Sequence, residues 1–206
     1  MVRGMAKIVT VAGRKGGIGK TCTSVHLATY LSGLGRTLLL DGDPNRSASG
    51  WAKRGELPFS VTGVTQAARH MDEAEYVVMD TEAQPSPEDL EDIAGGAHFL
   101  VLPSPPDVLG LEVLWRTIED LQNYGREADF AVLLTMVPPW PSREGAQARQ
   151  ALKEAELPVF ESQIRRIAAF GKAALAGVPV YEVEDRRAEA GWQDYRKVGE
   201  EVSRAL

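Results

Sequence analysis

Short apolar runs along the chain alternate with longer stretches in which apolar residues recur at helical spacing. Short apolar runs are typical of buried strands, and the longer stretches are typical of amphipathic helices. We therefore predict strands over Lys7–Ala12, Arg36–Asp41, Tyr76–Asp80, His98–Leu102, Phe130–Val137 and Val178–Val183. Helices are predicted over Lys20–Leu34, Ser47–Arg54, Pro87–Gly95, Leu109–Tyr124, Arg143–Glu156, Phe170–Ala176 and Ala190–Leu206.

This alternation predicts an α/β fold with a doubly wound, mostly parallel sheet and helices on both faces. Helix ends carry the expected signals, with Gly33 and Gly35 closing the first predicted helix and Asp107 positioned to cap the fourth. A chain of 206 residues that is 44% hydrophobic can bury one core, so we expect residues 1–206 to form a single domain. Sheets of this kind place ligands at the carboxyl ends of their strands.

The segment between the first strand and the first helix, residues 14–22, reads RKGGIGKTC. A glycine-rich loop at a helix N-terminus points backbone N–H groups at a phosphate, so the segment predicts a P-loop. The predicted nucleotide-binding residues are Gly16, Gly17, Ile18, Gly19, Lys20, Thr21 and Cys22. Lys20 is expected to reach the β- and γ-phosphates, and Thr21 to hold Mg²⁺. Arg14 stands where the standard pattern has glycine, and Lys15 is a second lysine.

Aspartates follow two of the predicted strands at the edge where the loop lies. Asp41 and Asp43 stand at the tip of the second strand, in LLLDGDPNRSASGW, and Asp80 ends the apolar run YVVMD. A carboxylate at such a strand tip can meet Mg²⁺ or an attacking water. Asp-Gly-Asp-Pro is also a common turn sequence, which is the alternative for the first pair.

The loop KGGxGKT, followed by D-x-D-P and then by YVVMD, resembles the deviant Walker A sequence of the ParA/MinD family of ATPases. The resemblance implies a P-loop NTPase that hydrolyses ATP, with ATP and Mg²⁺ as cofactors. It assigns Mg²⁺ to Thr21, Asp41 and Asp80, and catalysis to Lys15, Asp41 and Asp43. In that family the extra lysine crosses a dimer interface to the partner's bound nucleotide. Lys15 is therefore implied to act in trans, within an ATP-sandwich homodimer. The chain departs from the family at Glu82, where proline is frequent.

A net charge of −6 argues against a protein that coats nucleic acid through its global field, so DNA contacts are expected only from a local patch. The segment Ser162–Tyr181 has no acidic residue and contains Arg165, Arg166 and Lys172. The family has I-P-R-N where this chain reads IRRI, and that stretch helps form its DNA-facing surface. The resemblance thus implies nonspecific DNA binding by these three side chains, while a solvated helix face is the alternative. Further basic residues that could extend the patch, each interleaved with acids, are Arg186, Arg187, Arg196 and Lys197.

Within the family, the segment DPNRSASGWAKRG resembles the small partition ATPases. This implies plasmid or chromosome partitioning with a ParB-like adaptor, in the cytoplasm and on the nucleoid. Two alternatives stay open: a positioner of a protein cargo, such as a carboxysome-type assembly, and an enzyme resembling dethiobiotin synthetase. Since only residues 1–6 precede the first strand, we expect no N-terminal helix-turn-helix and no operator binding.

Other branches of the superfamily need features that this sequence does not show. The tail GWQDYRKVGEEVSRAL is mixed in charge, and the apolar runs are strand-sized, so no membrane partner is expected. Cys22 is the single cysteine, which excludes a disulfide framework and the cluster of the nitrogenase iron protein.

Overall fold

The computed structural model describes residues 5–123 and 129–206, which form one sheet covered by helices. The sheet has the order β3-β2-β4-β1-β5-β6, and all neighbouring strands are parallel. The strands are Lys7–Val11 (β1), Thr37–Asp41 (β2), Ser60–Gly63 (β3), Tyr76–Asp80 (β4), Phe99–Ser104 (β5) and Phe130–Leu134 (β6). The α-helices are Lys20–Ser32 (α1), Ser47–Ala52 (α2), Pro87–Gly96 (α3), Val108–Asn123 (α4), Glu144–Glu154 (α5), Ala169–Ala176 (α6) and Ala188–Ala205 (α7). Short 3₁₀ helices span Val64–Arg69 (η1), Met71–Glu73 (η2) and Val180–Glu182 (η3).

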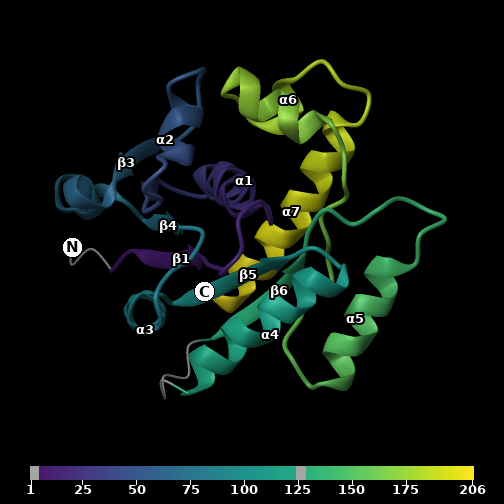
Figure 1. The fold of residues 1–206 in the computed structure, drawn as a ribbon. Coiled ribbons are helices and arrows are strands. Elements are labelled where there is room, and N and C mark those ends of the chain that lie inside the picture. Colours follow the sequence, from purple (N-terminus) through teal and green to yellow (C-terminus); the bar gives the residue numbers. More distant parts are fainter. Residues whose placement is uncertain (1–4, 124–128) are drawn as a thin grey trace.

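Helices pack on both faces of this sheet (Figure 1), with α1 and α7 against one face and α3, α4 and α5 against the other. Neighbouring residues of β5 face opposite layers: Val101 belongs to the core beneath α1, whereas Leu100 and Leu102 belong to the core beneath α4. A strand buried on both faces has no polar side to show in its sequence, which is why it reads as a continuous apolar run. The predicted doubly wound α/β class is confirmed.

The C-terminal helix α7 lies directly on α1, the helix that follows the P-loop. Its apolar residues Tyr195, Val198 and Val202 are fully buried against the rest of the domain. Gly199 lies so close to Tyr30 of α1 that an added Cβ would overlap the tyrosine ring. The apolar face of the tail is therefore used within the protein. No helix in residues 5–123 and 129–206 combines the length and hydropathy needed to cross a bilayer.

The predicted helices are all present, with ends displaced by at most two residues, although Tyr124 lies outside the described residues. Asp107 caps α4 as predicted, because its Oδ1 accepts a hydrogen bond from the N–H of Gly110 at 2.8 Å. The prediction for Phe130–Val137 was too long, since β6 ends at Leu134. One strand, β3, was missed: it has four residues, lies at the sheet edge and has a single buried residue, so its sequence lacks an apolar run.

The predicted strand Val178–Val183 is wrong, because that segment forms no part of the sheet and contains η3 instead. Its backbone groups are bonded to side chains: Nε2 of His26 accepts from the N–H of Val180 at 3.1 Å. The indole of Trp51 donates to the carbonyl of Val178 at 3.2 Å. His26 is buried, donates through Nδ1 to the carbonyl of Cys22, and its pKa is lowered by burial to about 4. These bonds hold the apolar segment against α1 and α2, away from any strand edge.

The outer edge of β6 is covered by the segment of residues 158–166. Its carbonyls and N–H groups bond to Val132, Leu134 and Val137 in turn, with parallel bridges Val132↔Val159 and Val137↔Arg165. This irregular pairing on β6 carries the IRRI sequence to the carboxyl edge of the sheet, where the P-loop also lies.

Substituting Gly199 by alanine is expected to destabilise the protein by about 1–3 kcal/mol, because the new methyl group would force α7 away from Tyr30. The matched control is Gly171→Ala in α6, where an added Cβ meets no atom within 4 Å. That substitution should be neutral or stabilise by up to about 1 kcal/mol through helix propensity. Urea denaturation of the two variants and the wild type measures both effects. Equal stability of the two variants would contradict the close α1–α7 packing.

Candidate nucleotide-binding site

The loop between β1 and α1 has the backbone shape of a phosphate cradle. Gly17 (φ 74°) and Gly19 (φ 90°) are in the left-handed region, which side chains other than glycine rarely adopt. Gly19 caps α1, and its carbonyl accepts from the N–H of Thr23 at 2.8 Å, so the first N–H groups of the helix face the loop. The hydroxyl of Thr135, just beyond β6, donates to the carbonyl of Ile18 at 2.9 Å and fixes the loop to the sheet edge.

The Lys20 side chain bonds back to the loop that precedes it. Its side chain is buried, and Nζ donates to the carbonyl oxygen of Lys15 at 3.0 Å. Burial lowers the pKa of Lys20, while the nearby carboxylates of Asp80 and Asp43 act in the opposite direction. A buried ammonium group beside helix N–H groups is the arrangement that attracts an anionic phosphate.

Asp80, at the carboxyl end of β4, is completely buried and only half satisfied. Its Oδ1 accepts a hydrogen bond from the hydroxyl of Ser24 in α1 at 2.9 Å, whereas Oδ2 has no hydrogen-bond partner. Burial raises the pKa of Asp80 to about 6, against the opposing effect of the Thr21 and Ser24 hydroxyls. The sequence prediction missed Ser24, although its position four residues after Lys20 places it one helical turn farther along α1.

The unpaired oxygen of Asp80 and the neighbouring Thr21 fit a magnesium ion. Mg²⁺ prefers oxygen ligands and is commonly held by one or two carboxylates together with substrate phosphates and water. In residues 5–123 and 129–206 no group of three or more His, Cys, Asp or Glu side chains is arranged to hold a metal ion. The donor set therefore suits a cation that arrives with a nucleotide.

Asp41 lies beside Asp80 in the sheet, since the two residues are register partners at the ends of β2 and β4. Its Oδ2 accepts from the N–H and hydroxyl of Ser49 at 2.8 and 2.5 Å, and its Oδ1 from the N–H of Asp43 at 3.2 Å. Asp43 in turn accepts hydrogen bonds from Asn45 and from the hydroxyl of Ser47 at 2.9 Å. The alternative that Asp-Gly-Asp-Pro forms a turn is thus partly right, because Asp41 and Asp43 organise the β2–α2 loop through these hydrogen bonds. This loop begins at the carboxyl end of β2, next to Asp80.

The two basic residues at the start of the loop face different surroundings. The Arg14 guanidinium forms an ion pair with Asp120 of α4. The side chain of Lys15 is half-buried and has no hydrogen bond or ion pair with any described residue. The structure therefore brings Lys20, Thr21, Asp41 and Asp80 together at one edge of the sheet, and the Lys15 side chain has no polar partner among the described residues.

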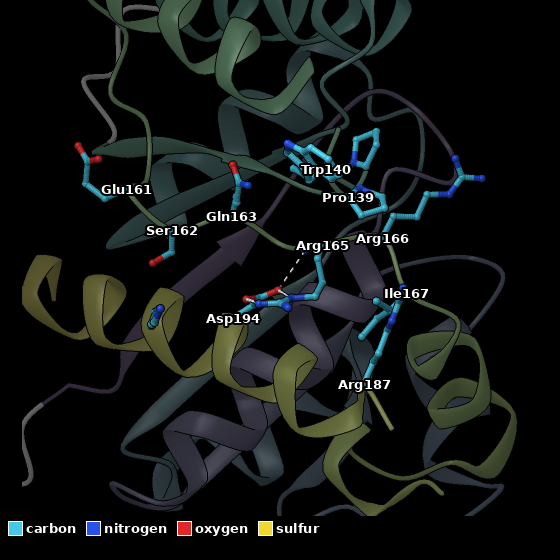
Figure 2. A pocket seen from close by; sticks show the side chains of 13 residues that line it. Pro139, Trp140, Glu161, Ser162, Gln163, Arg165, Arg166, Ile167, Arg187 and Asp194 are labelled. Atoms are coloured by element: carbon cyan, nitrogen blue, oxygen red, sulfur yellow. Dashed lines mark hydrogen bonds and ion pairs between the residues drawn. The ribbon is translucent and has the colours of Figure 1, made fainter. Parts of the chain in front are cut away.

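Two of the three predicted DNA-binding residues, Arg165 and Arg166, line a cleft of about 690 Å³, which we call the basic cleft (Figure 2). It lies between the loop after β6, the segment of residues 161–167 and α7. The Arg165 guanidinium forms two bonds to Asp194 of α7, Nε to Oδ2 at 2.7 Å and Nη2 to Oδ1 at 2.8 Å, and the Arg165 N–H donates to Oδ2 at 3.1 Å. Lys172, outside the cleft, pairs with Asp185 at 2.9 Å. Arg166 extends away from Arg165 and Asp194.

The charges of Arg165 and Lys172 are therefore already balanced within the chain. Three cations of the cleft have no ion pair with a described residue: Arg166, Arg187 and Lys197. Sequence alone indicated the basic segment but gave no signal for the Arg165–Asp194 pair, whose members are 29 positions apart.

The profile of the CobQ/CobB/MinD/ParA nucleotide binding domain matches residues 9–180. The chain belongs to this family. It is 37% identical over 205 residues to "Maintenance of carboxysome distribution protein A" of Gloeobacter kilaueensis, a match that covers 96% of this chain and 94% of that protein. It is 34% identical over 146 residues to "Protein ParA" of Rhizobium radiobacter, covering 64% of this chain and 65% of that protein.

A solved structure of apo McdA from Cyanothece has the same fold, with a TM-score of 0.76 at 19% identity. The superposition covers 98% of this chain and 99% of the McdA chain. The predicted family of ParA/MinD-type ATPases is confirmed. The match to the Gloeobacter carboxysome distribution protein covers more of this chain than the match to "Protein ParA" does.

Replacing Asp80 by asparagine is expected to stabilise the protein without nucleotide or Mg²⁺ at pH 8, by on the order of 1–3 kcal/mol. Because the pKa of Asp80 is raised in the fold, from 3.8 to about 6, ionisation costs stability as pH rises through that value. The gain should therefore shrink below pH 6 and vanish near pH 4. The effect of His26, whose pKa is lowered, has the opposite sign and cancels between variant and wild type.

Thermal unfolding in EDTA between pH 4 and 8 measures this difference, with the exposed Asp92→Asn substitution as the charge control. A pH-independent difference between Asp80→Asn and the wild type would contradict the buried, ionised carboxylate.

Proposed function

We propose that this ATPase uses ATP binding to form a dimer that holds nonspecific DNA, and that it positions a protein assembly through an adaptor. The observation that carries the proposal is the unpaired Lys15 beside an otherwise assembled site. Lys20 and Asp80 already form hydrogen bonds at the loop and at α1, whereas the Lys15 side chain has no hydrogen bond or ion pair with a described residue. A lysine of this kind supplies charge to a nucleotide held by a second copy.

ATP and Mg²⁺ are the proposed ligands. Residues 16–22 would bind the phosphates, and Thr21, Asp41 and Asp80 would hold the magnesium ion directly or through water. When bound, Mg²⁺ supplies charge that neutralises the phosphate oxygens. Asp41 and Asp43 are proposed to orient the attacking water, because hydrolysis of this type depends mainly on positioning and electrostatics. Their hydrogen bonds to Ser49 and Asn45 hold both carboxylates in place for that task.

A protein cargo is favoured over plasmid or chromosome partitioning by the extent of similarity. The relative named for carboxysome distribution matches nearly the whole chain at 37% identity, whereas "Protein ParA" matches about two thirds of it. We therefore place the protein on the nucleoid, in the cytoplasm, with a cargo adaptor as its partner. Partitioning with a ParB-like adaptor is the second candidate, and the 34% identity to "Protein ParA" supports it.

DNA binding is proposed to centre on the basic cleft. Arg166, Arg187 and Lys197 carry charge that the described chain does not neutralise, so they can contact phosphates independently of base sequence. Arg165 supports the cleft through Asp194, and Lys172 contributes only if its pair with Asp185 opens. A synthetase of the dethiobiotin type would gain nothing from such a surface, so ATP-dependent retention on DNA separates the two classes.

The Lys15→Ala variant should bind Mg-ATP as the wild type does but lose most of its dimer-dependent hydrolysis, on the order of 100-fold. Lys20→Ala should instead lose tight nucleotide binding, because the buried ammonium group is removed from the phosphate site. Equilibrium nucleotide titration and steady-state phosphate release measure the two effects. A Lys15→Ala protein with full hydrolysis would rule out the sandwich dimer.

Reversing the charge of Arg166, as Arg166→Glu, should weaken ATP-dependent retention on random-sequence DNA about tenfold at low salt and flatten its salt dependence. The matched control is Arg69→Glu, in η1 beside β3, at the opposite edge of the sheet. Filter binding at several salt concentrations provides the measurement. If both substitutions weaken binding equally, the effect is one of net charge and the cleft is not the DNA surface.

A further inference from the structure

The residue that breaks the standard P-loop pattern has a specific contact. Arg14 stands where glycine is usual, and its guanidinium pairs with the Asp120 carboxylate on α4. The two side chains are 33% and 26% exposed, so the pair is shielded from water more than the surface pair Lys153–Glu161, at 46% and 74%. Such shielding strengthens an ion pair and holds its geometry.

The pair connects the beginning of the loop to α4, a helix that otherwise meets this part of the loop without a polar contact among the described residues. A cavity of about 10 Å³ lies between Arg14 and Lys15 on one side and Val113 and Thr117 of α4 on the other. In the described part of the chain, no other hydrogen bond or ion pair joins residues 13–19 to α4. The Arg14–Asp120 pair is therefore the polar link that sets the distance between loop and helix.

The backbone of Lys15 is consequently fixed at two neighbouring points. Its own carbonyl accepts from Nζ of Lys20, and the residue before it is tied to Asp120. The residue after it, Gly16, is exposed and has only the Ala83 side chain near an added Cβ, at 4.0 Å. Without the Arg14 contact, the peptide that carries Lys15 would be held from one side only.

We propose that Arg14 and Asp120 form a positioning pair that directs the Lys15 side chain out of its own loop, toward the nucleotide bound by a second copy of the chain. The pair touches neither substrate nor cofactor and acts through Lys15. This inference rests on the proposed function, since it presupposes that Lys15 works in trans. A positioning role for this pair explains why arginine stands at position 14, where the standard P-loop pattern has glycine.

The test is a set of substitutions in the full-length protein: Arg14→Ala, Asp120→Ala, both together, and Arg14→Ala combined with Lys15→Ala. Each is measured below its melting temperature for Mg-ATP affinity, for ATP-dependent dimer mass and for kcat. Lys153→Ala, which removes an exposed ion pair elsewhere, is the control.

We expect Arg14→Ala and Asp120→Ala each to lower kcat about fivefold to 20-fold, since misplacing a catalytic group by about 1 Å can cost 100-fold. Mg-ATP affinity should stay within about twofold, because the phosphate cradle and Lys20 are intact. The double variant should lose no more than either single variant, because one contact is removed in all three. Asp120→Glu should retain activity, and Arg14→Ala should add no loss to Lys15→Ala.

Wild-type kcat and dimerisation in Arg14→Ala would overturn the inference, as would equal losses of nucleotide affinity and kcat, which indicate a merely structural role. Failure of the proposed function is visible separately, as full hydrolysis by Lys15→Ala alone. An inactive Lys15→Ala beside a fully active Arg14→Ala would reject the positioning pair and leave the sandwich dimer standing.

Discussion

The carboxylate of Asp80 is a charge that the fold buries without fully satisfying. Parallel pairing of β4 with β1 and β2 sets it at the carboxyl edge of the sheet, where Ser24 donates to Oδ1 and Oδ2 has no hydrogen-bond partner among the described residues. A buried carboxyl group with an open oxygen costs stability, as its raised pKa of about 6 indicates. The P-loop, Lys20 and the Asp41 loop lie beside this group, so a cation bound there with a phosphate would offset the cost of burying the Asp80 charge.

Sequence reasoning succeeded where the chemistry is local. The P-loop motif is contiguous, and its glycines at 17 and 19 have the positive φ angles that the motif requires. Strand and helix assignments followed from apolar runs, as in β5, because burial on both faces leaves an unmistakable pattern. The confirmed family and fold class rest on these local signals.

Most of the failures share one physical cause, which is that partners far apart in sequence decided the outcome. Val178–Val183 has a strand-like sequence, yet His26 and Trp51 take up the backbone groups that a sheet would have used. Asp194 neutralises Arg165 across 29 positions, and Asp120 holds Arg14 across 106. No periodicity or motif encodes such pairs. The short strand β3 was missed for a different reason, since it is an edge strand with little apolar content.

Fold alone does not specify what a protein of this family does in the cell, because one scaffold serves many functions. We propose a division of roles between two lysines of the loop, in which Lys20 binds the nucleotide of its own subunit and Lys15 contacts the nucleotide of the partner.

Mixing two inactive variants tests that division most directly. A Lys15→Ala subunit keeps its cradle for ATP, and a Lys20→Ala subunit still presents Lys15, so a mixed dimer contains one complete site. Phosphate release should therefore reappear when the two proteins are combined, and it should depend on their ratio. A mixture as inactive as its separate components would contradict action of Lys15 in trans.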